Sequence, residues 1–216
     1  THLEEIAPSC VALSSLVDIF VGLQTSADQI YIIHADHEDE SYIYSHDKQG
    51  REFKIEKGIL RKSIYDTQLV SYEKIKANSY IIFPYKCENG VLTHYEDKDF
   101  RKQFPYATAH LLQYETKLGE RAVDKSAQWF EYGRSQAITK ITQEKLVMPS
   151  IISSAVNVTE EDADTIPCAG FFITAKGEHT LAEAKKILES AEFYDYLKLI
   201  GIFTTGKSRR LTVKDI

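Results

Sequence analysis

The stretch Ser41-Tyr-Ile-Tyr-Ser-His-Asp-Lys-Gln-Gly50-Arg-Glu-Phe-Lys-Ile-Glu56 alternates apolar and polar residues on both sides of a short polar segment. Alternation with a period of two is the pattern of a half-buried β-strand. The segment Asp47–Gly50 has turn chemistry, and Gly50 suits a left-handed position because glycine adopts positive φ without steric cost. The stretch therefore predicts a β-hairpin.

Further strands are indicated on both sides of this hairpin. Residues 16–22 and 30–34 are rich in β-branched and aromatic residues and enclose a segment with turn chemistry, so we expect them to pair. The strand pattern continues over Tyr80–Tyr85 and Val91–Tyr95. Pro84 lacks a backbone N–H, so it should lie at a strand end or at a sheet edge.

Helical patterns follow in the second half of the chain. Apolar residues at spacings of three and four predict a helix that opens near Pro105 and ends near Gly119. Thr180-Leu-Ala-Glu183 is a capping box that predicts a helix N-terminus, and a second helix should follow to about Ile200. Residues 210–216 return to alternation, which favours an extended segment. We therefore predict an α+β fold with a mixed, mostly antiparallel sheet and a few helices packed at one side.

The composition is typical of a globular protein. Of the 216 residues, 43% are hydrophobic and 27% are charged, and no apolar run approaches the roughly 18 residues that a membrane span requires. The length suits one domain over residues 1–216. Cys10, Cys87 and Cys168 lie too far apart for a zinc motif, and their odd number argues against a disulfide framework. We therefore expect a cytoplasmic protein.

Charge is distributed unevenly along the chain. The formal net charge is −6, but residues 1–47 contain nine acids and no Lys or Arg. Residues 48–76 contain eight bases and four acids, and residues 196–216 contain five bases and one acid. Such basic segments can follow the phosphates of a nucleic acid, and a solvated charged face is the alternative. The candidate phosphate contacts are Lys54, Lys57, Arg61, Lys62, Lys207, Arg209 and Arg210.

The segment Trp129-Phe-Glu-Tyr-Gly-Arg134-Ser-Gln136 has the composition of a surface that contacts nucleic acid. Arg134 can donate two hydrogen bonds to guanine or to a phosphate, and Gln136, next to Ser135, can pair with adenine. The alternative is a core edge at which an arginine packs against aromatic rings. We assign Trp129 and Tyr132 mainly to the scaffold that braces this loop.

Two other patterns are unspecific. Gly201-Ile-Phe-Thr-Thr-Gly206-Lys-Ser208 matches the phosphate-loop pattern, but that loop requires a strand before it and a helix after it. Here we expect a helix before residues 201–208 and an extended segment after them, so these residues are better interpreted as a flexible basic loop. Residues 34–47 are rich in histidines and acids, but their spacing is typical of a solvated acidic loop, so we assign no metal site. No catalytic residue can be picked out with any specificity.

Several motifs succeed one another along nearly the whole chain. They are Val21–Ile33 with its glycine and Gln-Thr turn, Tyr80–Tyr85, Lys117–Arg121, Trp129–Gln136, Lys145–Ser153, Lys186–Ser190 and Arg209–Ile216. Their order resembles the DNA target-recognition domain of TaqI-like adenine methyltransferases and fused restriction-modification enzymes. The catalytic half of such enzymes carries a Gly-rich S-adenosylmethionine loop and an Asn-Pro-Pro-Tyr motif, and neither occurs here.

The resemblance implies sequence-specific recognition of double-stranded DNA. It implies a longer parent protein whose N-terminal catalytic domain methylates adenine with S-adenosylmethionine, and the missing start methionine agrees with an excised piece. No cofactor or metal is then expected in this chain. In this model the DNA contacts are Gln24 and Thr25 for positioning, Arg134, Ser135 and Gln136 for bases or backbone, and the seven basic residues named above for phosphates.

Two other interpretations stay open. The chain is alternatively a protein-interaction or specificity-subunit module that grips a separate methylase or nuclease through the helices of residues 180–200. Such a module would show an exposed apolar helix face. A free-standing enzyme that uses residues 34–47 would bind a metal. The recognised bases, and whether the parent protein also cleaves DNA, do not follow from the sequence.

Overall fold

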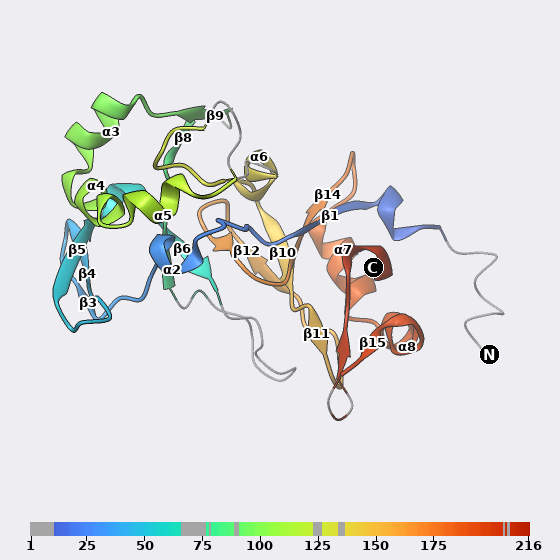
Figure 1. Cartoon of the computed structure of the whole chain (residues 1–216). Coiled ribbons are helices and arrows are strands. Elements are labelled where there is room, and N and C mark those ends of the chain that lie inside the picture. Colours follow the sequence, from blue (N-terminus) through green and yellow to red (C-terminus); the bar gives the residue numbers. More distant parts are fainter. Residues whose placement is uncertain are drawn as a thin grey trace.

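The computed structural model describes residues 11–65, 77, 79–88, 91–122, 127–133, 137–204, 206 and 208–216 (Figure 1). The α-helices of this part of the chain are α2 (Asp28–Tyr31), α3 (Asp97–Gln103), α4 (Pro105–Leu112), α5 (Glu115–Gly119), α6 (Ile138–Ile141), α7 (Leu181–Leu188) and α8 (Ala191–Ile200). Short 3₁₀ helices are η2 (Leu13–Ser15), η3 (Lys57–Ile59) and η4 (Val213–Asp215). None of these helices has the length and apolar character needed to cross a membrane.

The strands of the same residues form five small sheets. One four-stranded sheet has the order β1 (Val17–Val21), β14 (Phe171–Ala175), β10 (Lys145–Met148), β12 (Thr159–Glu161). The other four-stranded sheet has the order β13 (Ile166–Pro167), β6 (Leu60–Ile64), β7 (Ser79–Ile82), β2 (Ile32–Ile33). One three-stranded sheet has the order β3 (His37–Glu38), β4 (Tyr42–His46), β5 (Glu52–Glu56). The other three-stranded sheet has the order β11 (Ile151–Ile152), β16 (Arg209–Arg210), β15 (Ile202–Phe203). The fifth sheet pairs β8 (Tyr85–Glu88) with β9 (Val91–His94). Among these described strands only β13 and β6 pair in parallel, so the α+β class with mostly antiparallel pairing is confirmed.

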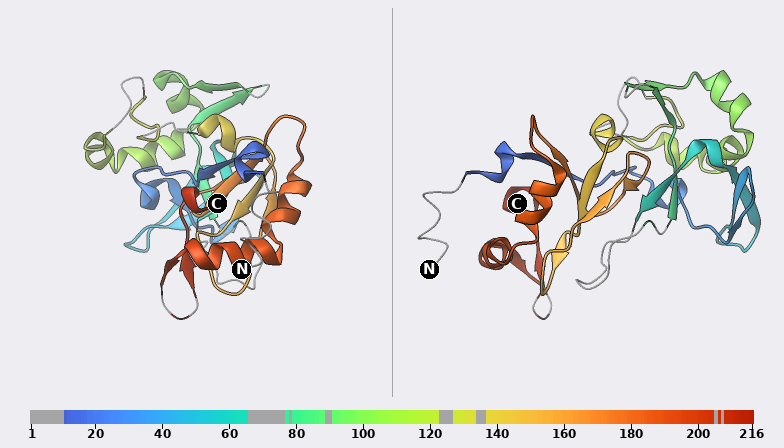
Figure 2. Two further views of the ribbon diagram at one scale, coloured as in Figure 1. Left: turned by 90° about the vertical axis from the view of Figure 1, so that its right-hand side faces the viewer. Right: turned by 180° about the vertical axis from the view of Figure 1, so that it is seen from behind.

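The molecule has two halves (Figures 1 and 2), and each contains a hydrophobic core. Strand β14 contributes to both, because its successive side chains point to opposite faces of the sheet. Phe171 and Ile173 belong to the core beneath α7 and α8, whereas Phe172 belongs to the core of the half that contains β2–β9. Val147 of β10 packs against Ile64 of β6 and adds a contact between the halves. The expectation of one domain over residues 1–216 stays a prediction.

The hairpin predicted over residues 41–56 is present. Strands β4 and β5 pair over five residues, from Tyr42 opposite Glu56 to His46 opposite Glu52. Gly50 has a φ of +77°, as the turn requires. The Asp47 carboxylate accepts hydrogen bonds from the backbone N–H groups of Gln49 and Arg51, both at 2.9 Å. These bonds join near neighbours, so the sequence can encode the turn locally.

Two strand predictions are wrong. Residues 16–22 and 30–34 do not pair, since β1 pairs with β14 and residues 28–31 form helix α2. In the turn before that helix, the Thr25 hydroxyl donates to the Asp28 carboxylate at 2.6 Å and accepts from the Ala27 N–H at 3.0 Å. Residues 210–216 are not one extended segment either, because the Asp215 carboxylate caps the 3₁₀ turn η4. A short apolar run specifies neither its partner nor, at this length, its conformation.

The helix predictions hold, but helices α3 and α6 were not predicted. Pro105 begins α4, whose N-terminus is capped by the Glu56 carboxylate at 2.7 and 2.9 Å from two backbone nitrogens, and the helical region ends with α5 at Gly119. Both hydrogen bonds of the Thr180 capping box are present, and α8 ends at Ile200. Helix α3 was not predicted, since its exposed charged residues outnumber its one buried residue, Phe100. Pro84 lies between β7 and β8, as expected.

Candidate nucleic-acid interface

The outer face of the β3–β4–β5 sheet carries aromatic rings around one lysine. His37, Tyr44 and Lys54 lie opposite one another across the three strands, and the rings of His37 and Tyr44 stack with centroids 4.4 Å apart. The Lys54 ammonium lies 4.1 Å from the Tyr42 ring centroid and 4.4 Å from that of Tyr106 on α4. We call these five residues the aromatic-lysine face. Rings of this kind stack on bases, and a lysine held between them can meet a phosphate.

Two further lysines follow this face in the chain: Lys57 begins η3, the short turn between β5 and β6, and Lys62 lies in the middle of β6. Lys57 pairs with Glu38 at 3.1 Å, and the Tyr80 hydroxyl donates to the same carboxylate at 3.2 Å. The hydrogen bond from Lys57 lowers the pKa of Glu38, so part of the Lys57 charge is neutralised locally. Lys62 lies opposite Tyr80 in the ladder, is exposed, and forms no ion pair with a described residue. Of the two lysines, Lys62 is the more available to a polyanion.

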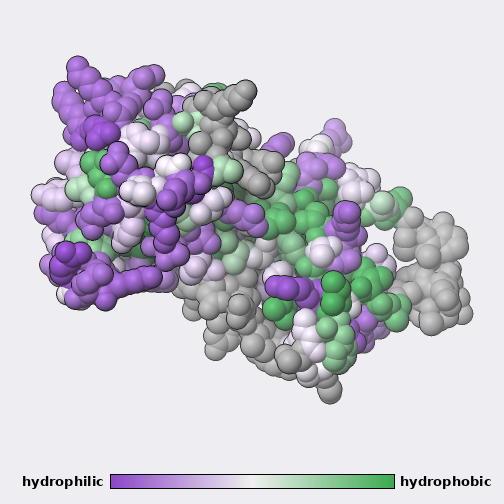
Figure 3. Space-filling view, viewed as in Figure 1, coloured by the Kyte–Doolittle hydropathy of each residue, from purple (hydrophilic) through white to green (hydrophobic). Residues whose placement is uncertain are grey.

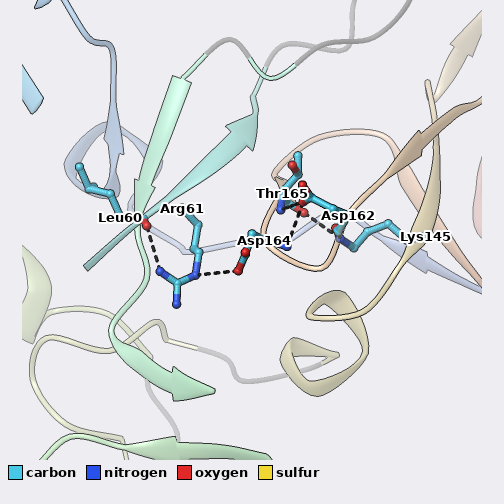
Figure 4. A network of polar contacts seen from close by, with 6 residues as sticks. All are labelled: Leu60, Arg61, Lys145, Asp162, Asp164 and Thr165. Atoms are coloured by element: carbon cyan, nitrogen blue, oxygen red, sulfur yellow. Dashed lines mark hydrogen bonds and ion pairs between the residues drawn. The ribbon is translucent and has the colours of Figure 1, made fainter. Parts of the chain in front are cut away.

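Arg61 instead points into a network between the two halves (Figure 4). Its Nε lies 3.5 Å from the Asp164 carboxylate, and its Nη1 donates to the Leu60 carbonyl at 3.0 Å. Adjacent residues of a strand face opposite sides, so Arg61 and Lys62 cannot serve the same surface. The structure places Arg61 in a contact that joins β6 to the loop between β12 and β13.

Lys145 anchors that loop from within the protein. It has no exposed surface, and its ammonium donates to the carbonyls of Asp162 and Thr165, the latter at 2.8 Å. Burial lowers the pKa of Lys145 from 10.5 to about 8. The Asp162 carboxylate also accepts from the N–H groups of Asp164 and Thr165. The carboxylate that faces Arg61 is therefore carried on a well-bonded loop.

The predicted positioning residues Gln24 and Thr25 differ in exposure. Thr25 is fully buried, and its hydroxyl is used in the turn that starts α2. Gln24 is exposed and lines a surface pocket of about 510 Å³ together with Lys140. The neighbouring Gly22 allows close packing, because a Cβ there would lie 2.8 Å from the backbone nitrogen of Ala169. The Gln-Thr turn is therefore structural, with Gln24 as its accessible side chain.

Of the segment that begins at Trp129, residues 130–132 are buried and Trp129 packs against the core. The Tyr31 hydroxyl donates to the carbonyls of Phe130 and Glu131, and the Tyr132 hydroxyl donates to the Ile82 carbonyl at 2.6 Å. Burial raises the pKa of Tyr31 to about 12. The Trp129 indole N–H donates to Asp97. The scaffold assigned to Trp129 and Tyr132 is present, and the predicted contacts Arg134, Ser135 and Gln136 lie outside the described residues.

The C-terminal basic residues lie in the other half of the molecule. Strands β15 and β16 pair through Ile202 with Arg210 and Phe203 with Arg209. The Arg209 guanidinium lies 4.2 Å from the Phe203 ring centroid, while Arg210 is exposed. A strand follows the phosphate-loop pattern of residues 201–208 where a helix would be needed, so the pattern is a hairpin here. Lys207 lies outside the described residues. Among the described basic candidates, Lys54, Lys57 and Lys62 thus lie in one half of the molecule and Arg209 and Arg210 in the other (Figures 1 and 2).

Several acidic and histidine side chains of residues 34–47 are used in contacts within this segment. His46 pairs with Asp36 at 2.8 Å, and the Asp39 carboxylate accepts from the Tyr44 hydroxyl and from two backbone N–H groups. Within the described ranges, no three His, Cys, Asp or Glu side chains gather in a way that could hold a metal. This segment supports the sheet that carries the aromatic-lysine face.

A basic pocket that the sequence did not single out lies at the tip of the β4–β5 hairpin. Its volume is about 250 Å³, and it is formed by the hairpin tip, α2, and the junction of α4 and α5. It shares Gln113 with a neighbouring pocket that is lined by Tyr44, Lys54 and Tyr106. We call it the amide pocket; its lining is Gln29, Ile30, Lys48, Gln49, Arg51, Gln113, Tyr114 and Lys117. The charged residues of the hairpin tip could be identified from the sequence, whereas the other lining residues are brought to the pocket by tertiary packing.

The two halves differ in surface character (Figure 3). The half with β3–β5 is mainly hydrophilic on the side shown, and hydrophobic residues gather near α8 and β15. Exposed apolar residues there are Ile187, Tyr196, Leu199, Ile200, Ile202 and Phe203. The basic pocket and the apolar surface are therefore separate features.

Comparison with known proteins gives one informative similarity. No protein-family model matches the chain. Over 160 residues the chain is 24% identical to the type II restriction enzyme and methyltransferase RM.Eco57I of Escherichia coli. The match covers 69% of this chain but 16% of that protein, so the chain spans a small part of its relative. This similarity supports a protein of a restriction-modification system.

Proposed function

We propose that this chain recognises double-stranded DNA for an adenine-specific DNA methyltransferase of a restriction-modification system. The observation that carries the proposal is its similarity to a protein whose name combines a restriction enzyme and a methyltransferase. The order of motifs from the Gln-Thr turn to the C-terminus, described above, adds the adenine-specific class and the role in target recognition.

The geometry of the β4–β5 hairpin supports this function. Phosphates supply most of the affinity of DNA complexes, and cations on a rigid element can follow them. The aromatic-lysine face and the amide pocket are neighbours along β4 and β5, since the pockets at both share Gln113, and Lys62 lies on β6 opposite Tyr80; Glu52 lines the same surface as Lys54. Arg61 contributes to the scaffold because it pairs with Asp164, and Thr25 contributes to it because it is buried.

Methyl transfer belongs to another part of the parent protein in this proposal. Neither the Gly-rich S-adenosylmethionine loop nor the Asn-Pro-Pro-Tyr motif of the catalytic half occurs in this sequence. The catalytic domain would bind S-adenosylmethionine and take the adenine out of the duplex, at an unstacking cost of a few kcal/mol. This chain would hold the DNA in register for that step.

The test is a duplex titration of this chain at about 50 and about 200 mM salt, where binding through several phosphates weakens by orders of magnitude. The Lys54→Gln/Lys62→Gln double variant should bind more weakly and show a salt slope smaller by about two, since each lost phosphate contact lowers it by about one. Lys185→Gln/Lys186→Gln on α7 is the matched control and should bind like the unchanged chain. Binding that is undetectable at low salt, or that ignores salt, contradicts the proposal.

A second candidate function is supported by the exposed apolar surface near α8. Leu199, Ile202 and Phe203 are 69%, 59% and 63% exposed, and an exposed apolar patch commonly marks a protein interface. In this alternative the chain is a specificity-subunit module that grips a separate methylase or nuclease. Leu199→Ser would then weaken association with that enzyme, and the duplex titration would show no binding by this chain.

A further inference from the structure

We infer that Gln49 and Gln113 of the amide pocket read base edges, while Lys48, Arg51 and Lys117 hold the adjoining phosphates. The inference rests on the proposed function and assigns base recognition within the same region.

The pocket has the charge of an anion site. Three cations line this pocket, whose volume is about 250 Å³, and its described lining residues include no acid. Lys48 and Lys117 are exposed and form no ion pair with a described residue. Arg51 pairs with Asp47 through its Nε at 2.7 Å, which leaves the terminal nitrogens of its guanidinium for a ligand. A phosphate diester is a ligand of suitable charge and is present on every duplex.

The amides supply a different kind of contact. A glutamine carries a donor and an acceptor at its tip and can pair with the N6 and N7 atoms of adenine, whereas a cation alone does not distinguish bases. The side chains of Gln49 and Gln113 are exposed and make no hydrogen bond to a described residue, so both amides are free for a ligand. Gln29 instead accepts from Lys48 at 3.3 Å and holds this wall in place.

The pocket is held by contacts that do not need the ligand. The Asp47 carboxylate binds the N–H groups of Gln49 and Arg51, and Gly50 supplies the positive φ that turns the chain. Tyr114 and Gln113 follow α4 directly, with their N–H groups bonded to the carbonyls of Leu111 and His110. A preformed site loses less conformational entropy on binding, which suits recognition.

The experiment begins with selection of the preferred sequence from a pool of randomised duplexes by the unchanged chain. Gln113→Ala and Gln49→Ala are then measured against the selected duplex and against a shuffled duplex of equal composition. We expect each to lose affinity for the selected duplex by on the order of tenfold, with a much smaller loss for the shuffled one and an unchanged salt slope. Gln103→Ala, exposed at the end of α3, is the control and should change neither.

The cation variants have the opposite signature. Lys117→Gln should weaken binding to both duplexes alike and lower the salt slope by about one. If the glutamine variants keep the sequence preference of the unchanged chain, the pocket is only an anion site and the inference is wrong, while the proposed function stands. If the unchanged chain binds no duplex at low salt, the proposed function is wrong and the inference with it. Unfolding curves show whether each variant remains folded.

Discussion

Among single residues, Lys145 has the most unusual environment. A fully buried ammonium is costly, and here it is retained because two backbone carbonyls accept from it. A neutral amine still has two N–H groups, so both hydrogen bonds can survive deprotonation. The residue therefore stabilises the loop of residues 162–165 in either protonation state, but at a desolvation cost when it is charged.

This cost predicts a pH dependence of stability. The pKa of Lys145 falls from 10.5 in the unfolded chain to about 8 in the folded one, so between these pH values the unfolded chain binds the extra proton. The free energy of unfolding should then rise with pH across this window, by up to about 1.4 kcal/mol per unit from this group. Below pH 8 the penalty is fully present, since the group is charged in both states.

The measurement is urea unfolding at pH 8 and at pH 10, for the unchanged chain and for Lys145→Met. Tyrosines titrate in both proteins, so the difference between the two proteins isolates Lys145. We expect the unchanged chain to gain stability relative to the variant by about 2 kcal/mol as the pH rises. Parallel pH dependence in the two proteins would show that Lys145 is charged without penalty.

At the scale of the secondary-structure element, local hydrogen bonds explain why some predictions succeeded. The β4–β5 turn and the α7 capping box are each closed by side chains within four residues of their partners. Strand β1 differs in this respect, because it is paired with residues about 150 positions later. Helix α2 also follows a local turn, in which Thr25 bonds Asp28, but the apolar run of residues 30–34 favoured a strand in the sequence.

The α7 capping box gives a prediction for an element. Thr180→Ala removes the acceptor of the Glu183 N–H, so the variant should lose about 1 kcal/mol of stability. Thr180→Ser keeps the hydroxyl and should lose much less. Thermal unfolding of the three proteins checks this. A variant Thr180→Ala as stable as Thr180→Ser would mean that water replaces the cap at no cost.

At the scale of the whole molecule, the described residues join the two halves through buried contacts and through the Arg61–Asp164 ion pair. Phe172 reaches across the β10–β14 sheet into the core of the other half, and Val147 packs on Ile64. The Arg61–Asp164 pair joins the same halves at the surface, where Asp164 is 83% exposed. Apolar burial therefore contributes most of this connection, because exposed ion pairs contribute about 0–1 kcal/mol.

The ion pair gives a prediction that separates scaffold from DNA contact. Arg61→Gln and Asp164→Asn should each reduce stability by less than about 1 kcal/mol. Because Arg61 is turned toward Asp164, Arg61→Gln should leave the salt slope of duplex binding unchanged, whereas Lys62→Gln should lower it by about one. Salt titrations of the two single variants measure the difference. A slope that falls equally in both variants would restore Arg61 as a phosphate contact.

The local features of this protein followed from its residues alone. Alternation, turn residues and caps specify the β4–β5 hairpin, the start of α4 at Pro105 and the α7–α8 pair, because each depends on neighbours a few positions apart. The α+β class followed from the mixture of these patterns. Lys54 and Lys62 could likewise be chosen from the charge distribution along the chain.

The partners and exposure of residues far apart depended on the folded arrangement. Nothing near Thr25 in the sequence indicates its burial, and Arg61 and Lys62 are neighbours that face different surroundings. The amide pocket joins residues from the hairpin tip, α2 and the α4–α5 junction, which meet only when the β-sheets and helices pack. Such convergence is set by long-range packing of apolar surfaces, and periodicity within one segment carries no information about it.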